Sequence, residues 1–421
     1  METKNIQQFL NSYSVKMVVV AVLALLLLIP SFLIMDIIQE RIALSETVKQ
    51  ELHAQWGGRQ VVSGPVLNVP HAQGVAHFLP ENLTVDGALN PETRKRGIYT
   101  VAVFEATLRL SGDFTPLAKV LPDPQHAHYQ WDAAYFTFGI SDMRGIRNTP
   151  VLVLDGVPRE VRPGLADTDL SGSGITVMAG IADPTKPMHF DIDLVLNGSE
   201  SLQVEALGKT SSISLQSDWP EPSFAGAFLP EQRSVTADGF AADWRVTHLN
   251  RNFPQQWIGD KFSTDESAVG VELLIPADHY RKSMRSVKYA ILFIGLNFIV
   301  FLFIEIKSKV RIHPFQYSLV AFALLLFYLL LLSLGEQIGF NPAYLVSAIA
   351  VTALISWYVA GILKDMRIVG WVILLQAGLY GFLFAILQMQ DYALLTGSIG
   401  LFVILAAIMR ASGRIRWYAD Q

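Results

Sequence analysis

The residues best suited to metal chemistry are two histidines, His126 and His128, which have Asp123 and Asp132 nearby. Residues two apart share one face of a β-strand, so two imidazoles at this spacing could hold one metal ion. A metal site needs at least a third protein ligand, and the sequence does not indicate which residue would supply it. We therefore interpret the pair as solvated histidines of a proline-containing loop, and we predict neither a metal nor any other cofactor.

Two further motifs resemble parts of enzyme sites but lack the residues that would complete them. Ser63-Gly64-Pro65 lacks the G-x-S-x-G context of a nucleophile elbow, so we interpret it as a structural turn. Gly172-Ser173-Gly174 lacks the lysine and the spacing of a phosphate-binding loop and is typical of a flexible hairpin tip. We predict that the protein is not an enzyme. The alternative is a hydrolase that uses a nucleophile of the large domain or the histidine pair.

The composition separates the chain into two kinds of segment. The chain has 421 residues, of which 51% are hydrophobic, only 16% are charged and none is cysteine, whereas a soluble globular protein carries about 25% charged residues. Residues 36–280 hold 18 basic and 31 acidic side chains, a formal charge of −13, and the remainder carries +8. The absence of cysteine excludes a thiol nucleophile and a disulfide framework. The acidic block argues against nucleic acid as a partner.

Six apolar stretches are long enough to cross a bilayer, which takes about 20 residues in a helix. The first is too long for the core of a signal peptide and has no cleavage site after it, so we expect an uncleaved anchor. We predict an α-helical polytopic membrane protein with three parts: 1–35 with the first helix, 36–280 as a large inserted domain, and 281–421 with five helices. The six stretches are 17–35, 286–304, 315–334, 343–363, 368–387 and 392–409.

The distribution of lysine and arginine predicts the orientation in the membrane. Cytoplasmic loops carry an excess of these residues. The short loops 335–342 and 388–391 contain none of them, whereas those on the other side contain Lys4, Lys16, Lys307, Lys309, Arg311, Lys364, Arg367, Arg410, Arg414 and Arg416. We therefore expect both termini in the cytoplasm and the large domain in the periplasm. Four cations break the pattern, and we expect them among lipid headgroups: Arg281, Lys282, Arg285 and Lys288.

Asn297 and Gln376 are the two strongly polar side chains near the middle of a predicted span. No Asp, Glu, Lys or Arg occupies the middle of any predicted span, although ion-coupled transporters generally need such groups there. We interpret the pair as an interhelical hydrogen bond. The alternative is a transporter of a lipid or small molecule, whose polar path through the bundle would be abolished by leucine at both positions.

The block 36–280 begins with a helical stalk and continues as a mainly-β domain. Ile38, Ile42, Val48 and Leu52 recur at roughly helical spacing, so the first helix should run on until Gly57-Gly58. Beyond it, short β-branched or aromatic runs separated by turn residues predict a mostly antiparallel sandwich. The predicted strands are 98–110, 135–140, 151–154, 190–196, 202–207, 212–217 and 240–249, and the predicted turns are Asp86-Gly87, Asn197-Gly198 and Asp238-Gly239.

Long strings of the sequence resemble the CreD family of inner-membrane, cell envelope integrity proteins. They include WGGRQVVSGPVLNVP (56–70), 208–230 and 239–254 in the large block, and 287–298, 313–320 and 327–345 among the helices. The resemblance covers nearly the whole chain. The sequence departs from the family at Gly335 and Gln337, where a serine and a histidine usually flank the glutamate.

The resemblance implies a cellular role without a reaction. Family members belong to Gram-negative inner membranes and are associated with envelope maintenance, with a carbon-source-responsive two-component system, and with responses to E-group colicins and β-lactams. No catalytic reaction or cofactor is established for them. By resemblance, then, we expect a non-enzymatic envelope protein whose large domain binds an envelope component or an inner-membrane protein.

Aromatic residues of the large domain are the candidates for that binding, because aromatic and arginine side chains often anchor interfaces. We select 217–222 and 250–254 as the preferred patch, and we expect alanine at Trp219 or Arg251 to impair envelope-stress tolerance without changing protein abundance. Packing in the core is the alternative for the tryptophans. The candidate residues are Trp219, Trp244, Arg251, Phe253 and Trp257.

Overall fold

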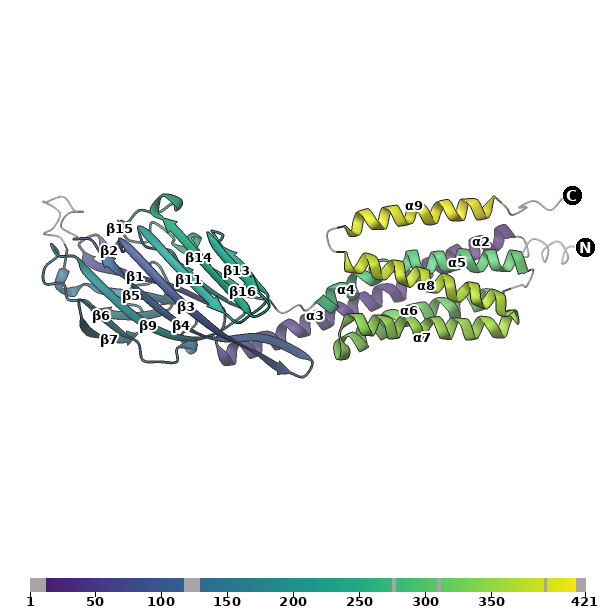
Figure 1. Cartoon of the computed structure of the whole chain (residues 1–421), viewed down its shortest axis with the longest axis horizontal. Coiled ribbons are helices and arrows are strands. Elements are labelled where there is room, and N and C mark those ends of the chain that lie inside the picture. The colour runs from purple at the N-terminus through teal and green to yellow at the C-terminus, as the bar shows by residue number, and fades with distance from the viewer. Residues whose placement is uncertain (1–12, 117–128, 275–277, 309–311, 390–391, 414–421) are drawn as a thin grey trace, which may run out of the picture. The chain divides into compact units, whose positions relative to one another are not determined.

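The computed structural model describes residues 13–116, 129–274, 278–308, 312–389 and 392–413. The chain separates into two units (Figure 1). One unit is helical and combines residues 1–44 with residues 277–421, and the other, residues 45–276, is a β domain. The large domain is thus an insertion into a helical protein.

The first helical segment consists of α2 (Tyr13–Leu26) and α3 (Leu28–Trp56), with a single turn residue between them. α3 ends at Trp56, as the stalk prediction requires. The indole Nε1 of Trp56 donates to the backbone oxygen of Phe104 at 3.3 Å, and the guanidinium of Arg94 lies 4.7 Å from the centre of the Trp56 ring. The last turn of the helix is therefore held by the β domain that follows it.

Sixteen described strands build the β domain. They are β1 (Gln60–His71), β2 (Gly74–Phe78), β3 (Asn82–Arg96), β4 (Tyr99–Phe114), β5 (Tyr135–Ile140), β6 (Val151–Leu154), β7 (Val157–Pro163), β8 (Gly174–Met178), β9 (Met188–Ser199), β10 (Ser201–Glu205), β11 (Thr210–Ser217), β12 (Pro222–Gly226), β13 (Gln232–Thr236), β14 (Gly239–Thr247), β15 (Gln256–Ile258) and β16 (Ala268–Leu273). All seven predicted strands are present.

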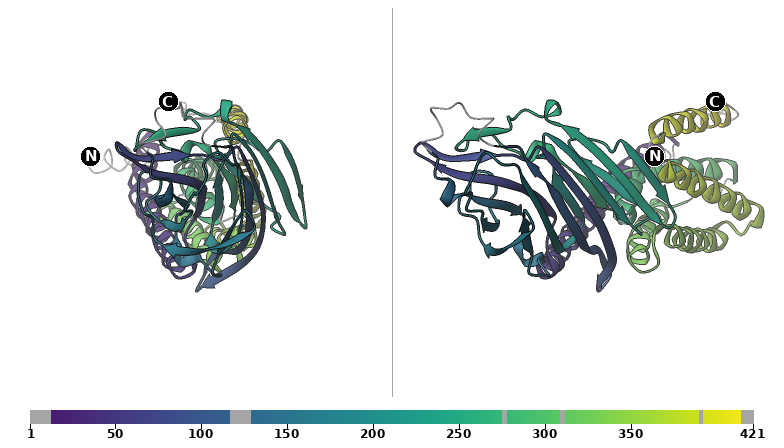
Figure 2. Two further views of the ribbon diagram at one scale, coloured as in Figure 1. Left: turned by 90° about the vertical axis from the view of Figure 1, so that its left-hand side faces the viewer. Right: turned by 60° about the vertical axis from the view of Figure 1, so that its left-hand side comes forward.

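The strands form two sheets that share β7. Sheet A has the order β12-β16-β10-β1-β5-β8-β7, with β2 attached to β1 and β15 attached to β2, and sheet B has the order β7-β6-β9-β4-β3-β11-β14-β13. Figure 2 shows the strands from two further directions as facing layers. Rings of the two sheets meet in a common core, since Phe114 of β4 lies 5.5 Å from Phe136 of β5. The arrangement is mixed rather than purely antiparallel, because β1 pairs with β10 and β3 with β11 in parallel.

Two of the three predicted turns lie inside strands. Gly87 is in the middle of β3 and Gly198 is near the end of β9. A Cβ atom on Gly87 would come within 2.5 Å of the side chain of Leu215, and one on Gly198 within 2.4 Å of the ring of Phe104. Glycine is therefore present in these strands for close packing. Only Asp238-Gly239 lies at a hairpin turn, between β13 and β14.

The described helices of the second half are α4 (Asp278–Lys288), α5 (Ala290–Ser308), α6 (Pro314–Ile338), α7 (Phe340–Leu363), α8 (Met366–Gln388) and α9 (Ala393–Ser412). Four described helical stretches are long and apolar enough to cross a membrane: Ala21–Trp56, Pro314–Ile338, Phe340–Leu363 and Met366–Gln388. A fifth is present if α4 and α5, which meet at an angle of 47°, form one broken span. The prediction of six spans was therefore wrong.

The ends of the predicted bundle account for the difference. In the last predicted span, the apolar part of α9 is Leu394–Arg410, which is shorter than the four stretches that could each cross a membrane. The second predicted span began at Ser286, which lies in α4. α4 is a polar helix whose charges oppose entry into hydrocarbon, and it carries Arg281, Lys282, Arg285 and Lys288.

Candidate functional site

A row of four side chains crosses sheet A on its outer face. The strand registers pair Trp257 with His77, His77 with Asn68, and Asn68 with Tyr135. Directly opposed residues in neighbouring strands point to the same face, with Cβ atoms about 4.5–5.5 Å apart. All four side chains are buried, although the next residue of β5, Phe136, is the one that points into the core between the sheets. This outer face is therefore covered.

The orientation of the His77 ring is set by Asn68. Nδ1 of His77 lies 2.7 Å from Oδ1 of Asn68, and Nδ2 of Asn68 donates to the carbonyl oxygen of Val66 at 3.2 Å and to Oγ1 of Thr137 at 2.8 Å. A carbonyl oxygen only accepts hydrogen bonds, so the Asn68 amide must present its nitrogen there and its oxygen to His77. Nδ1 of His77 therefore carries a proton, and Nε2 faces the carboxylate of Asp169.

The loop 164–173, between β7 and β8, brings two aspartates over this row. Oδ2 of Asp169 lies 3.2 Å from Nε2 of His77, and the hydroxyl of Tyr135 donates to Oδ2 of Asp167 at 2.7 Å. Burial, together with this hydrogen bond, raises the pKa of Tyr135, so its hydroxyl stays protonated as a donor. One ligand atom from each of His77, Asp167 and Asp169 lies within 4.8 Å of the others. We call these three residues the histidine–aspartate centre.

A second buried polar cluster surrounds Glu205 in sheet A. Its Oε2 accepts hydrogen bonds from the hydroxyls of Ser63 at 2.7 Å and Thr264 at 2.6 Å. Burial raises the pKa of the Glu205 carboxyl, and these two hydrogen bonds oppose the rise only in part. Ser63 lies at a register shift within β1 rather than in a turn, and its hydroxyl is engaged by the buried acid. This geometry differs from that of a nucleophile activated by histidine.

The outer face of sheet B is exposed and hollowed. A groove of about 380 Å³ runs over β3, β4, β11 and β14. Its floor contains the small side chains of Ala88 and Ala241, and Asp86, Arg109 and Asp243 are among its charged lining residues. The Arg109 guanidinium donates twice to Oδ2 of a neighbouring aspartate, at 3.0 Å and 2.8 Å. We call this feature the sheet B groove.

The five predicted binding residues of the β domain do not form one exposed patch. Trp244, Phe253 and Trp257 are buried. Three of the five gather at one place, because the Arg251 guanidinium lies 4.4 Å from the centre of the Phe253 ring and that ring lies 6.2 Å from Trp257. Trp257 also lies 5.4 Å from His77, so this group adjoins the histidine–aspartate centre. Burial lowers the pKa of Arg251 to about 10, so it remains charged at neutral pH.

Trp219 and Arg251, the two half-buried candidates, lie at opposite ends of β10 and β16. Nε1 of Trp219 donates to the backbone oxygen of Leu274 at 3.2 Å, whereas the Arg251 guanidinium reaches the backbone oxygen of Ala206 at 3.4 Å. Glu205 pairs with Ala268, so the two anchor points are separated by nearly the length of β16, roughly 20 Å at about 3.3 Å per residue. The sequence predicted one patch of residues 217–222 and 250–254, whereas the structure separates them.

Asn297 of α5 and Gln376 of α8 meet inside the helical unit. Both side chains are fully buried, and Nε2 of Gln376 donates to Oδ1 of Asn297. Nδ2 of Asn297 donates to the backbone oxygen of Phe293 at 2.9 Å, one turn earlier in its own helix. The pair thus makes the interhelical hydrogen bond that the sequence predicted.

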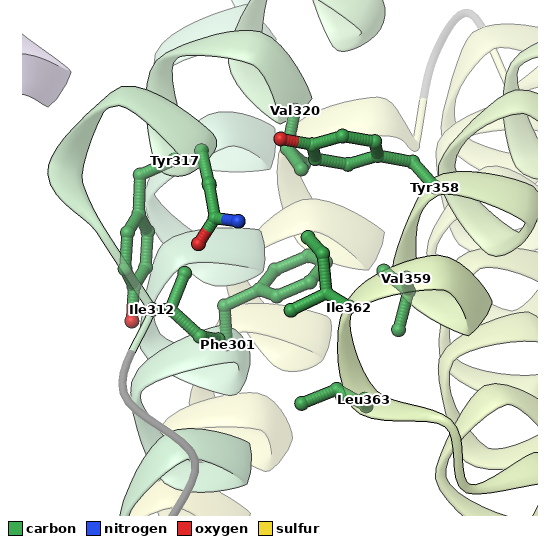
Figure 3. Close-up of a pocket in the computed structure, with 9 residues that line it drawn as sticks. Phe301, Ile312, Tyr317, Val320, Tyr358, Val359, Ile362 and Leu363 are labelled. Carbon is green, nitrogen blue, oxygen red and sulfur yellow. The ribbon is translucent and has the colours of Figure 1, made fainter.

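Two cavities of the helical unit differ in size. The side chains of Phe301, Ile312 and Ile362 line a space of about 10 Å³ (Figure 3), which is enough for about one water molecule. A groove of about 900 Å³ lies between α7 and α8 and is lined mainly by apolar side chains. Neither Asn297 nor Gln376 lines the larger groove.

The sequence interpretation missed the most developed polar site. His126, His128 and Asp123 lie outside the described residues. Gly172 and Ser173 lie in the loop that joins the antiparallel strands β7 and β8, and Gly174 is the first residue of β8. His77 could have been linked to Asn68 from the short hairpin between β1 and β2, whose residues pair from His71 and Gly74 outward. Nothing local to the sequence connects His77 with aspartates about 90 residues later.

The fold and these sites define an integral membrane protein with a large inserted β domain. The comparisons agree with this class: the family described as "Inner membrane protein CreD" matches residues 12–418. The chain is 32% identical to the inner membrane protein CreD of Escherichia coli (strain K12) over 419 residues, which cover 94% of this chain and 91% of that protein. The chain belongs to the CreD family and is a multi-pass protein of the inner membrane.

Proposed function

We propose that this protein is a non-enzymatic envelope protein whose β domain faces the periplasm and binds a polar envelope component. The binding would contribute to tolerance of envelope stress, colicins and β-lactams. The sheet B groove carries the proposal, because it is the exposed concave surface of about 380 Å³ to which four strands contribute polar side chains. Strand positions of this kind are rigid, which favours a preorganised binding surface.

The chemistry of the groove limits what it can bind. Asp86 and Asp243 supply carboxylate acceptors, of which Oδ1 of Asp243 already accepts from Ser214, and the guanidinium of Arg109 is engaged by Asp191. Residues 36–280 carry a formal charge of −13, so a polyanion would be repelled. A chain rich in hydroxyl and amide donors matches this surface, and the sugar hydroxyls and acetamido groups of the peptidoglycan glycan strand supply such donors, away from the carboxylates of its peptide stems. We therefore propose a peptidoglycan-type ligand.

Paired substitutions in the groove test the proposal. Asp86→Ala combined with Asp243→Ala removes two exposed acceptors, so tolerance should fall while protein abundance stays unchanged. Glu160→Ala is the matched control, since Glu160 is an exposed acid of β7 outside the groove. Purified full-length protein should sediment with peptidoglycan sacculi, and the double variant should not. Full tolerance and normal sedimentation in the double variant would contradict the proposal.

A lipid-binding or lipid-transporting helical unit is the second candidate. The groove between α7 and α8 is lined by Leu345, Ile349, Ile373 and other apolar residues, and Asn341 is among its few polar ones. Its size and apolar lining suit an acyl chain.

Cationic side chains of α4 lie near the same end. Gln388 donates to Oδ1 of Asn341 at 2.7 Å, Lys282 donates to Gln388 at 3.3 Å, and Arg285 donates to the backbone oxygen of Leu387 at 3.3 Å. Two cations beside an apolar groove match a phospholipid with an anionic headgroup.

A bulky side chain in this groove distinguishes the two candidates. Ala348→Phe should reduce the phospholipid that copurifies with the full-length protein, and Ala350→Phe, on an exposed position of α7 outside the groove, should not. If the first variant loses tolerance while the sheet B variants keep it, the lipid function replaces the β-domain function. Leucine at both Asn297 and Gln376 should leave tolerance intact unless a polar transport path passes through them.

A further inference from the structure

The histidine–aspartate centre is not needed for binding at the sheet B groove, and it has the geometry of a ligand set. We propose that His77, Asp167 and Asp169 hold a divalent transition-metal ion, which fastens the loop 164–173 to the outer face of sheet A. The proposal concerns a different sheet from the proposed function and does not depend on it.

The direction of the His77 ring provides the first reason. Asn68 fixes the proton on Nδ1, so Nε2 presents its lone pair unless it is protonated as well. Nε2 lies 3.2 Å from Oδ2 of Asp169. A lone pair and a carboxylate oxygen repel one another at this distance, so either a proton or a metal ion must lie between them. The proton could belong to the imidazole or to the carboxyl group.

The charge of the surroundings favours the metal ion. The carboxylates of Asp167 and Asp169 face one imidazole, so an imidazolium would still leave a net charge of −1. Among the described residues, no lysine or arginine forms an ion pair with either aspartate. The backbone N–H of Asp169 and the hydroxyl of Tyr135 give neutral hydrogen bonds to Asp167. A divalent ion would balance both carboxylates at once.

The residues behind the ligands provide the third reason. Metal-bound histidines usually donate their other ring N–H to an oxygen, and ligating carboxylates are usually hydrogen-bonded in turn. The Nδ1–H of His77 donates to Oδ1 of Asn68, and the carboxylate of Asp167 accepts a hydrogen bond from the hydroxyl of Tyr135. Asn68 is itself held by Thr137. The centre thus has fixed ligand orientations before any ion enters.

The donor set defines the class of metal. One imidazole nitrogen and two carboxylate oxygens suit zinc, manganese, cobalt and related ions, whereas calcium and magnesium prefer oxygen ligands alone. The side chain of Asp169 is 29% exposed, so water can complete the coordination and an ion can enter from solvent. Three protein ligands on one rigid strand and one loop would make the loop position depend on the ion.

Zinc titration of the full-length protein in detergent micelles tests the site. The protein used for all titrations should carry His126→Ala and His128→Ala, so that these two histidines cannot bind zinc. We call it the background protein. We expect one zinc ion per chain, bound at the centre. Asp167→Asn with Asp169→Asn should weaken binding by at least about 100-fold, because these residues would contact the ion directly, and even loss of a group that only hydrogen-bonds to a ligand costs about 10–100-fold. Asp193→Asn, an exposed aspartate of β9, is the matched control and should bind normally.

Two further measurements keep the test decisive. Tyr135→Phe should weaken zinc binding by about 10–100-fold without abolishing it, since it removes only the bond that orients Asp167. Zinc should slow proteolysis within the loop 164–173 in the background protein and not in the double asparagine variant. The aspartates are only partly buried, so these variants should fold even if a His77 variant does not. Absence of zinc binding in the folded background protein, or equal binding by the double asparagine variant, would overturn the proposal.

Discussion

The two sheets of the β domain use their outer faces in opposite ways. Sheet B leaves its outer face in solvent, so along β3 exposed and buried residues alternate from Asn82 to Asn90. Sheet A buries both faces: every residue of β5 is buried, and β1 is buried along most of its length. The loop 164–173 and Thr264 contribute to the cover.

Polar side chains therefore have different roles on the two outer faces. On sheet B they are solvated and exposed to a ligand, as Asp86 and Asp243 are, although Asp243 also accepts a hydrogen bond from Ser214. On sheet A they must satisfy one another, as Asn68 and Thr137 do, because a buried polar group without a partner costs about 1–3 kcal/mol. Matched substitutions on the two faces should therefore have very different effects on stability.

The largest effect is expected at Trp257, on the covered face. Trp257→Ala removes a ring that packs against His77 and Phe262, and such truncations typically cost about 3–5 kcal/mol. Gln216→Ala, at an exposed position of the sheet B groove, should stay within about 0.5 kcal/mol of the wild type. Denaturant unfolding of the full-length protein in micelles, followed by protease resistance of the β domain, measures both. Similar losses would refute the distinction.

Two threonines offer a closer match, with a smaller expected effect. Thr137→Val on sheet A leaves Nδ2 of Asn68 with only the carbonyl oxygen of Val66 of its two acceptors, and the variant should lose about 1–2 kcal/mol of unfolding free energy. Thr107→Val on sheet B changes a solvated side chain in a strand that accepts valine well, so its stability should hold or rise slightly. The same unfolding assay applies, and a loss at Thr107 equal to that at Thr137 would count against the assignment of faces.

Glu205 predicts a pH dependence that belongs to sheet A alone. Its folded pKa is raised by burial above the unfolded value near 4.3, so the folded protein holds this proton more tightly. Its contribution to stability is complete below the unfolded pKa and is lost as pH rises through the folded pKa. Glu205→Gln removes this titration, so the variant should gain on the wild type as pH increases.

The control for that profile is Glu105→Gln, an exposed acid on the outer face of sheet B. Its stability should follow the wild type across the pH range. Thermal unfolding of the full-length protein at a series of pH values between 4 and 8 provides the measurement. Parallel profiles for wild type and Glu205→Gln would show that the acid is not held as the structure describes.

The same comparison explains which strands the sequence revealed. β11 and β14 of sheet B alternate buried and exposed residues, and both were predicted from that alternation. β1 and β16 of sheet A are buried on both faces, so their sequences show no period of two and were not recognised as strands. The equally buried β5 was predicted from its aromatic residues. β3 alternates clearly but was missed because its Asp86-Gly87 pair is typical of a turn.

The candidate site was partly predictable for a similar reason. Bulky aromatic residues are visible in a sequence, and Trp257 with Phe253 does lie beside the histidine–aspartate centre. The centre itself depends on a loop that returns to the sheet about 90 residues after His77, and only the fold brings Asp167 and Asp169 there. The Asn297–Gln376 bond was predictable because polar groups are rare in apolar spans and must find one another.

The smallest effect is expected for an ion pair on the exposed face. Arg109 donates to Asp191 at 2.8 Å, but its side chain is 61% exposed, and surface pairs of this kind contribute little because water and salt screen them. Arg109→Ala should therefore leave the unfolding midpoint within experimental error of the wild type at every salt concentration. A clear loss of stability that salt relieves would show that the outer face of sheet B is held by its charges, and the groove would then be a structural feature rather than a surface free to bind a ligand.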